Sequence, residues 1–189
     1  MKATRRTSAS TALCTALALL ASVACTTTAT PTPPPLGERF PSVRGEGLDG
    51  AARTIPDDLG GAPAILLVGY AQNAQFDADR WLFGLLQAQT PVQLIEVPTI
   101  PGLIPSLAGA WIDSGMRSGI PSEDWSTVVT VYGDGAAQVA SFTGREQPRN
   151  MRVLLLDGDG RVRWFHDRGF SARELLELDQ AARALTDGR

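Results

Sequence analysis

Cysteine is almost absent from this chain of 189 residues. Its two cysteines, Cys14 and Cys25, both lie in the first 25 positions. Thiol-based catalysis, disulfide exchange and a cysteine-ligated metal site each need a thiolate, so none of them can be built from the residues after Cys25. Any chemistry in the rest of the chain has to come from other side chains.

Lysine and histidine are equally scarce, with Lys2 and His166 the only examples. One histidine cannot form a zinc site without carboxylate help, and a histidine at a strand end is more often structural. The sequence also lacks the Gly-x-Ser-x-Gly motif of many serine hydrolases. We therefore predict no catalytic residue, no metal and no cofactor.

An uncharged stretch runs from Thr11 to Ala24, after three basic residues. It is too short for a membrane helix and predicts a secretory signal peptide over residues 1–24. The stretch ends in Ser22-Val23-Ala24-Cys25, which resembles the lipobox of bacterial lipoproteins, although Ser22 stands in place of the usual leucine. The resemblance implies cleavage before Cys25 and attachment of lipid, such as palmitate, to that residue. Ordinary cleavage after Ala24, leaving an unpaired thiol, is the alternative.

Residues 25–37 are predicted to be a tether. Threonine and proline dominate 26–35, a composition that favours an extended spacer without a core. Thr26 is not the aspartate that typically retains lipoproteins in the inner membrane of enteric bacteria. We therefore expect a domain in the periplasm, with its lipid in the outer membrane rather than the inner one.

Residues 38–189 are enough for one domain with its own core. Without the first 24 residues, the chain has 14 basic and 20 acidic residues and a formal charge of −6. This acidic balance argues against a nucleic-acid partner. The mature part has no apolar segment of about twenty residues, so the lipid would be its membrane anchor.

Hydrophobic periodicity predicts an α/β domain. Two short extended runs around Leu48-Asp49-Gly50 indicate an N-terminal hairpin, and the apolar run 64–68 is typical of a strand buried on both faces. Further along we expect a helix over 77–89, a strand over 92–97, a helix over 105–117, a strand over 128–132 and a short helix around 138–142. The apolar face of the first helix is assigned to Phe76, Leu82, Phe83, Leu85 and Leu86.

The C-terminal residues predict a ββα unit. Two strands, 153–156 and 162–165, flank Asp157-Gly158-Asp159-Gly160. We interpret this segment as a hairpin turn, because it lacks the closing glutamate of a calcium loop. In the last helix, Leu175, Leu178, Ala182 and Leu185 recur on one face.

Polar residues mark the predicted helix starts. Asp77 and Asp79 are expected to complement the positive end of the first helix. Asp134 is interpreted as an N-cap, and Ser171 with Glu174 as a capping box.

The order of these features resembles the thioredoxin-like superfamily, in particular its peroxiredoxin and periplasmic thiol-disulfide oxidoreductase members. The resemblance implies an α/β sandwich with a central mixed sheet, an N-terminal hairpin and a C-terminal ββα unit. Redox members carry a cysteine at the start of the helix after the central strand, where this chain has the amides Asn73 and Gln75. The family's cis-proline is also missing from its expected place, which Met151 occupies, with Pro148 a few residues early. The resemblance thus implies a member without thiol chemistry.

A second resemblance lies in the C-terminal hairpin. Leu154-Leu155-Leu156-Asp157 and Gly160-Arg161-Val162-Arg163-Trp164 look like the corresponding segment of the mitochondrial ATP-synthase assembly factor family. Its members also lack a redox-active cysteine pair and help to assemble the membrane sector of that enzyme. An exported lipoprotein would face the opposite side of the membrane, so we expect a shared fold rather than a shared client.

Three functional hypotheses remain at this stage. The first is a lipid-anchored, non-catalytic protein that binds another envelope protein and assists membrane-complex assembly, with Trp111 in the apolar stretch 101–121 as a candidate contact. The second is a small-ligand-binding or enzymatic domain that reuses the former active-site region around Tyr70, Asn73 and Gln75. The third is a pseudo-enzyme that regulates a true thiol oxidoreductase.

Overall fold

A computed structural model describes residues 32–102 and 106–188, and of residues 106–111 it describes the backbone alone. The predicted signal peptide, Cys25 and most of the predicted tether lie outside the described residues, as does the side chain of Trp111.

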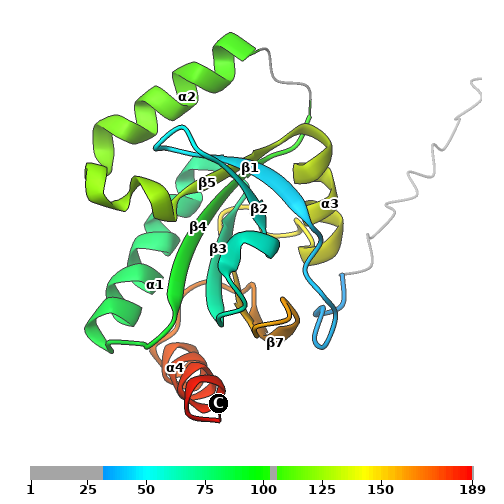
Figure 1. Ribbon diagram of the computed structural model, residues 1–189, viewed down its shortest axis with the longest axis vertical. Helices are drawn as coiled ribbons and strands as arrows, with labels where there is room; N and C mark the ends of the chain where they lie inside the picture. Colours follow the sequence, from blue (N-terminus) through cyan, green and yellow to red (C-terminus); the bar gives the residue numbers. More distant parts are fainter. Residues whose placement is uncertain (1–31, 103–105, 189) are drawn as a thin grey trace, which may run out of the picture. The chain divides into compact units, whose positions relative to one another are not determined.

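Seven strands form one mixed sheet in the order β2-β1-β5-β4-β3-β6-β7 (Figure 1). The three central strands β5, β4 and β3 pair in parallel, whereas the outer pairs are antiparallel. The predicted mixed sheet is therefore confirmed. The strands are β1 (Val43–Gly47), β2 (Ala52–Ile55), β3 (Ala64–Gly69), β4 (Gln93–Ile100), β5 (Val129–Tyr132), β6 (Arg152–Leu156) and β7 (Val162–His166).

Helices cover both faces of the sheet. Helix α3 packs on one face through Ala136 and Val139, and helices α1 and α4 pack on the other through residues such as Trp81 and Leu178. This arrangement confirms the predicted sandwich. The helices are α1 (Gln75–Gln87), α2 (Ser106–Gly119), α3 (Gly133–Thr143) and α4 (Ala172–Asp187), with short 3₁₀ turns η1 (Asp57–Leu59), η2 (Gln72–Ala74) and η3 (Ser122–Thr127).

Strand β3 lies at the centre of both hydrophobic cores. Leu66 and Val68 face the α3 side, while Ile65 and Leu67 face the α1 side, and all four side chains are buried. A strand in this position has no polar face, which explains its continuous apolar run.

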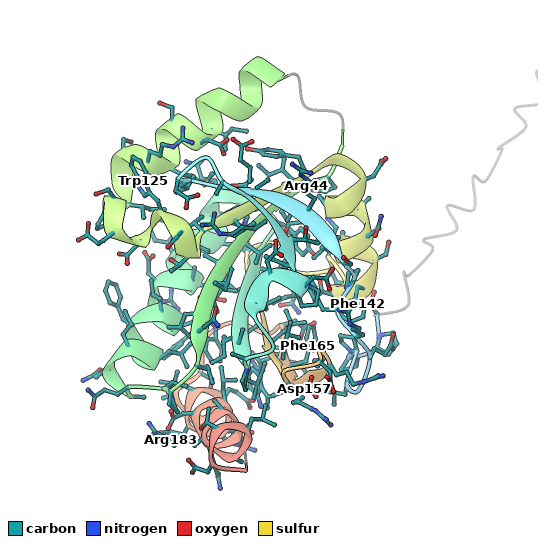
Figure 2. The ribbon with its side chains drawn as sticks, in the orientation of Figure 1. Arg44, Trp125, Phe142, Asp157, Phe165 and Arg183 are labelled. Atoms are coloured by element: carbon teal, nitrogen blue, oxygen red, sulfur yellow. The ribbon has the colours of Figure 1, made fainter. Side chains whose placement is uncertain are left out.

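Both predicted hairpins are present. Strands β1 and β2 are antiparallel, with Val43 opposite Ile55. Strands β6 and β7 are also antiparallel, and the turn between them contains Asp157 (Figure 2). Asp157 Oδ1 accepts hydrogen bonds from the backbone N–H groups of Asp159 (3.0 Å) and Arg161 (2.9 Å), and Gly160 adopts a left-handed φ of 74°. The Asp157 carboxylate therefore organises the turn itself, as expected for a hairpin rather than an ion loop.

The segment before β1 lies alongside β7. Gly37 N–H donates to the carbonyl of Val162 (2.8 Å), and Val162 N–H donates to the carbonyl of Glu38 (2.9 Å). Phe40 N–H donates to the carbonyl of Gly160 (2.9 Å), and the Phe40 ring is buried in the core on the α3 side. The chain thus enters the domain beside the last strand of the sheet.

One predicted helix cap is wrong, and a second is correct in position but makes no side-chain bond. Helix α3 begins at Gly133 with Tyr132 as its N-cap, so Asp134 lies inside the first turn, and the helix starts five residues before the predicted 138. Ser171 is the N-cap residue of α4, but its side chain makes no capping bond. Glu174 lies 3.5 Å from His166 Nδ1 instead, because β7 brings this ring beside the helix start.

Candidate functional site

Asp77, in the first turn of α1, joins two loops to this helix at the end of β3. Its Oδ2 accepts a hydrogen bond from the backbone N–H of Met151 (2.8 Å), and its Oδ1 accepts one from the backbone N–H of Phe170 (2.7 Å). The residue is only 6% exposed. From the sequence, Asp77 is expected to complement the positive end of the helix. In the structure its carboxylate mainly binds the loops before β6 and α4 to α1.

Arg152, the first residue of β6, is a fully buried cation near this junction. Its Nε donates to the carbonyl of Gly144 (3.0 Å), and its Nη1 donates to the carbonyls of Gln147 (2.6 Å) and Asn150 (2.9 Å). Its Nη2 has no hydrogen-bond partner among the described residues. Burial lowers the pKa of this guanidinium, and its main role here is to hold the loop between α3 and β6.

Tyr70 directly follows β3 and packs on the α3 side of the sheet. Its hydroxyl lies 2.6 Å from Thr143 Oγ1, and the guanidinium carbons of Arg152 and Arg145 lie 5.3 Å and 5.6 Å from its ring centroid. Burial raises the pKa of Tyr70 to about 12, so its phenol stays protonated near neutral pH. This environment suits a structural tyrosine better than an acid–base group.

Asn73 and Gln75 are exposed at the start of α1, in the region where redox relatives of the fold would carry thiols. Gln75 Nε2 donates to Asp79 Oδ1 (3.1 Å), and the same side chain hydrogen-bonds Glu96 on β4. Gln75 therefore lies on the α1 side of the sheet, whereas Tyr70 packs on the α3 side. The structure does not bring these predicted site residues to one common cleft.

Two clefts lie near the other end of β3, where that strand begins. One, of about 490 Å³, is polar and lies between Arg39, Asp57 and the turn 158–161, with an ion pair of 2.6 Å between Arg39 and Asp57. The other, of about 480 Å³, lies between Pro63 and Pro91. Neither is lined by Tyr70, Asn73 or Gln75.

His166 and the tryptophans are mostly accounted for by packing. His166 Nε2 lies 2.8 Å from the carbonyl oxygen of Gly169, and its ring stacks on Trp164. Trp81 is fully buried and contacts Trp164 and Phe170 edge-on, while Trp125 Nε1 donates to the carbonyl of Ile120 (3.0 Å). Within the described ranges, no group of three or more His, Cys, Asp or Glu side chains could hold a metal ion.

The outer face of α1 carries apolar residues that were predicted to be buried. Phe76, Phe83 and Leu86, which were assigned to its buried face, are 70%, 69% and 57% exposed. The helix packs on the sheet through Ala78, Trp81 and Leu85 instead. Two apolar stripes thus share one helix, and only one of them is covered in the described part of the chain.

Comparison with known proteins finds similar structures but no similar sequence. No protein-family model matches the chain, and no curated protein sequence matches it. A pneumococcal exposed lipoprotein thioredoxin, Etrx1 from Streptococcus pneumoniae, is similar in structure, with 12% identity, a TM-score of 0.52, and 74% of this chain and 98% of that chain covered. A SCO1/SenC family lipoprotein from Bacillus anthracis matches with 13% identity, a TM-score of 0.54, and coverage of 80% and 97%. BsSco, of the Sco family of cytochrome c oxidase assembly proteins, matches with 10% identity, a TM-score of 0.54, and coverage of 82% and 99%.

These similarities show that the fold is thioredoxin-like, as the sequence predicted. At identities this low they show the fold alone, and function has to be argued from the site. Among the described residues, no helix is both long enough and apolar enough to cross a bilayer.

Proposed function

We propose that this protein is a lipid-anchored, non-redox thioredoxin-fold protein that binds another protein of the bacterial envelope. Cys25 carries the lipid, and residues 25–37 hold the domain in the periplasm, with the outer membrane favoured. Two similar structures are themselves lipoproteins, which supports this arrangement.

The observation that carries the non-redox proposal is the absence of thiols after Cys25. The start of α1 presents Asn73 and Gln75, and amides can hydrogen-bond but cannot exchange disulfides. The nearby carboxylate of Asp77 is already committed to two backbone N–H groups. The region therefore supports a scaffold for binding rather than an enzyme.

A role in membrane-complex assembly is the class of function we favour for the binding. BsSco belongs to a family of cytochrome c oxidase assembly proteins, and the C-terminal hairpin resembles ATP-synthase assembly factors. Both comparisons concern proteins that act on membrane complexes. We propose that the partner here is likewise a subunit of an envelope complex.

Replacing Cys25 with serine tests the anchor. The full chain should fractionate with membranes and be labelled by palmitate, and Cys25→Ser should abolish this labelling. Cys14→Ser is the matched control, because Cys14 lies within the predicted signal peptide. A Cys25→Ser chain that is still labelled by palmitate would contradict the proposed anchor.

Crosslinking in intact cells, followed by affinity purification, tests the partner. We expect one specific envelope protein, and recovery of none would contradict the proposal. A thiol oxidoreductase as the captured protein would instead support the regulatory pseudo-enzyme. In parallel, the full chain should reduce insulin no faster than its Cys25→Ser variant.

A further inference from the structure

The exposed stripe on α1 forms a continuous ridge. Phe76, Asp79, Phe83 and Leu86 follow one another at intervals of three and four residues, so they lie on the same side of the helix. Apolar side chains exposed to this extent and aligned in this way mark an interaction surface more often than chance exposure. We call these four residues the α1 ridge.

An acidic flank borders the α1 ridge on the β4 side. Gln75 contacts both Asp79 and Glu96, so the two carboxylates lie close to one amide. Burial, together with the negative charge of Asp79, raises the pKa of Glu96, and no ion pair with Glu96 occurs within the described residues. A cation placed here would relieve an unbalanced, partly desolvated negative charge.

Strand β4 extends the same surface. On the face turned toward α1, Leu94, Glu96, Pro98 and Ile100 are all half-buried, although β4 is a central strand of the sheet. The helices therefore leave this strip partly open. The surface combines exposed aromatic rings, a strip of half-open sheet and two carboxylates.

Two other occupants fit these observations less well. Anionic lipid headgroups would be repelled by Asp79 and Glu96. Arg80 is the only basic residue of α1, whereas membrane-binding helices carry several basic residues beside their apolar face. The chain also enters the domain beside β7, across the domain from α1 in Figure 1. A second copy would carry the same net negative charge, which opposes self-association.

We propose that the α1 ridge and its Glu96 flank dock a basic amphipathic segment of the partner protein. Apolar side chains of that segment cover Phe76, Phe83 and Leu86, and a lysine or arginine pairs with Asp79 and Glu96. This inference deepens the proposed function and rests on it, since it states the chemistry of the partner and the surface that receives it.

Photocrosslinking from the ridge tests the inference in the full, membrane-anchored chain. A photoreactive phenylalanine at position 83, in intact cells, should form an adduct with another protein. Mass spectrometry should locate the adduct in a segment with lysine or arginine within one helical turn of apolar residues. The same photoreactive residue at Leu176, which is 66% exposed on α4, is the matched control and should not give this adduct.

Charge variants supply the second measurement. Asp79→Asn combined with Glu96→Gln should lower the adduct yield about tenfold, because charge pairs at an interface are worth that much in affinity. Asp134→Asn, an exposed acid on α3, should leave the yield unchanged. A melting curve for each variant distinguishes a loss of binding from a loss of folding. If the double variant unfolds, the adduct yield is measured with Asp79→Asn alone.

Several outcomes would overturn the inference. They are an adduct with lipid, an adduct with a second copy, an adduct insensitive to the two carboxylates, and no adduct at position 83. If the probe at Leu176 captures a partner while position 83 captures none, partner binding stands and this docking surface is wrong.

Discussion

Replacing Asp77 with alanine should destabilise the domain strongly. The change removes the acceptor for two backbone N–H groups, those of Met151 and Phe170, at a position only 6% exposed. Each buried donor left without a partner costs about 1–3 kcal/mol. The two together predict a loss of about 4 kcal/mol, a large part of the ~5–15 kcal/mol that typically stabilises a domain.

Guanidinium unfolding followed by tryptophan fluorescence is the assay for this variant. Of the four tryptophans, Trp81 reports on the region around Asp77, because its ring centroid lies 5.4 Å from that of Phe170. The denaturant concentration at the unfolding midpoint should fall. The slope of the unfolding free energy against denaturant concentration should stay the same, as expected for a change in stability without a change in compactness. Hydrogen exchange should also accelerate at the amides of Met151 and Phe170, because these donors lose their acceptor.

Two further variants make the measurement decisive. Asp77→Asn keeps one acceptor oxygen and should cost about half as much, whereas the exposed Asp134→Asn should change stability by less than about 0.5 kcal/mol. A loss below about 1 kcal/mol for Asp77→Ala would refute the idea that this carboxylate holds the two loops to α1.

Three other perturbations have defined outcomes. Arg152→Met should cost about 2–4 kcal/mol and speed hydrogen exchange in the loop 144–150, because one buried and two partly buried carbonyls lose their donor. Unchanged exchange there would contradict this role. A hydrogen bond from Arg53 holds the pKa of Asp49 at about 2, below its ordinary 3.8, so this stabilisation is present above pH 3.8 and is lost as the pH falls through 2. Asp49→Asn should therefore flatten the acid limb of the unfolding free energy, and an identical acid limb would count against the pair. Phe83→Ser should change the unfolding free energy by less than about 0.5 kcal/mol, because this ring is 69% exposed, and a larger loss in denaturant titration would mean that it packs in the fold.

Local patterns in the sequence were enough to predict the architecture. The apolar run 64–68 has no polar alternation, which only a strand covered on both faces tolerates, and it forms β3, an interior strand of the sheet. The Asp157-Gly158-Asp159-Gly160 turn likewise contains its own stabilising acceptor, so its structure depends on neighbours in sequence. Such features are readable because cause and effect lie within a few residues.

The error on α1 has a different origin. Trp81 and Leu85 repeat at helical spacing, and so do Phe76 and Phe83. Periodicity shows that both stripes are apolar but cannot tell which one the sheet covers. Only the packing of α1 against β3 and α4 decides that the phenylalanines face outward.

The hydrogen bonds of Asp77 to Met151 and Phe170 also could not be predicted from the sequence. The two donors are 74 and 93 residues away from Asp77 along the chain, and no local motif encodes bonds of that separation. Arg152 could have raised suspicion, since an arginine before four apolar residues of a buried strand needs a dedicated set of acceptors. Those acceptors come from the irregular loop 144–150, whose course follows from tertiary packing.

The segment from Gly37 to Phe40 has a consequence for how this protein can meet other chains. Strand β7 ends the sheet, and an uncovered end strand invites pairing by foreign strands, which leads to aggregation. Here the backbone groups of Val162 and Gly160 are already taken by the protein's own chain. A strand from another chain therefore has no unpaired backbone groups to bond at this part of the sheet, so the protein is protected against edge-to-edge addition there. Because the same bonds lie where the N-terminal segment joins the domain, a pull on that segment would load the Gly37–Val162 pairing before it reached the hydrophobic cores.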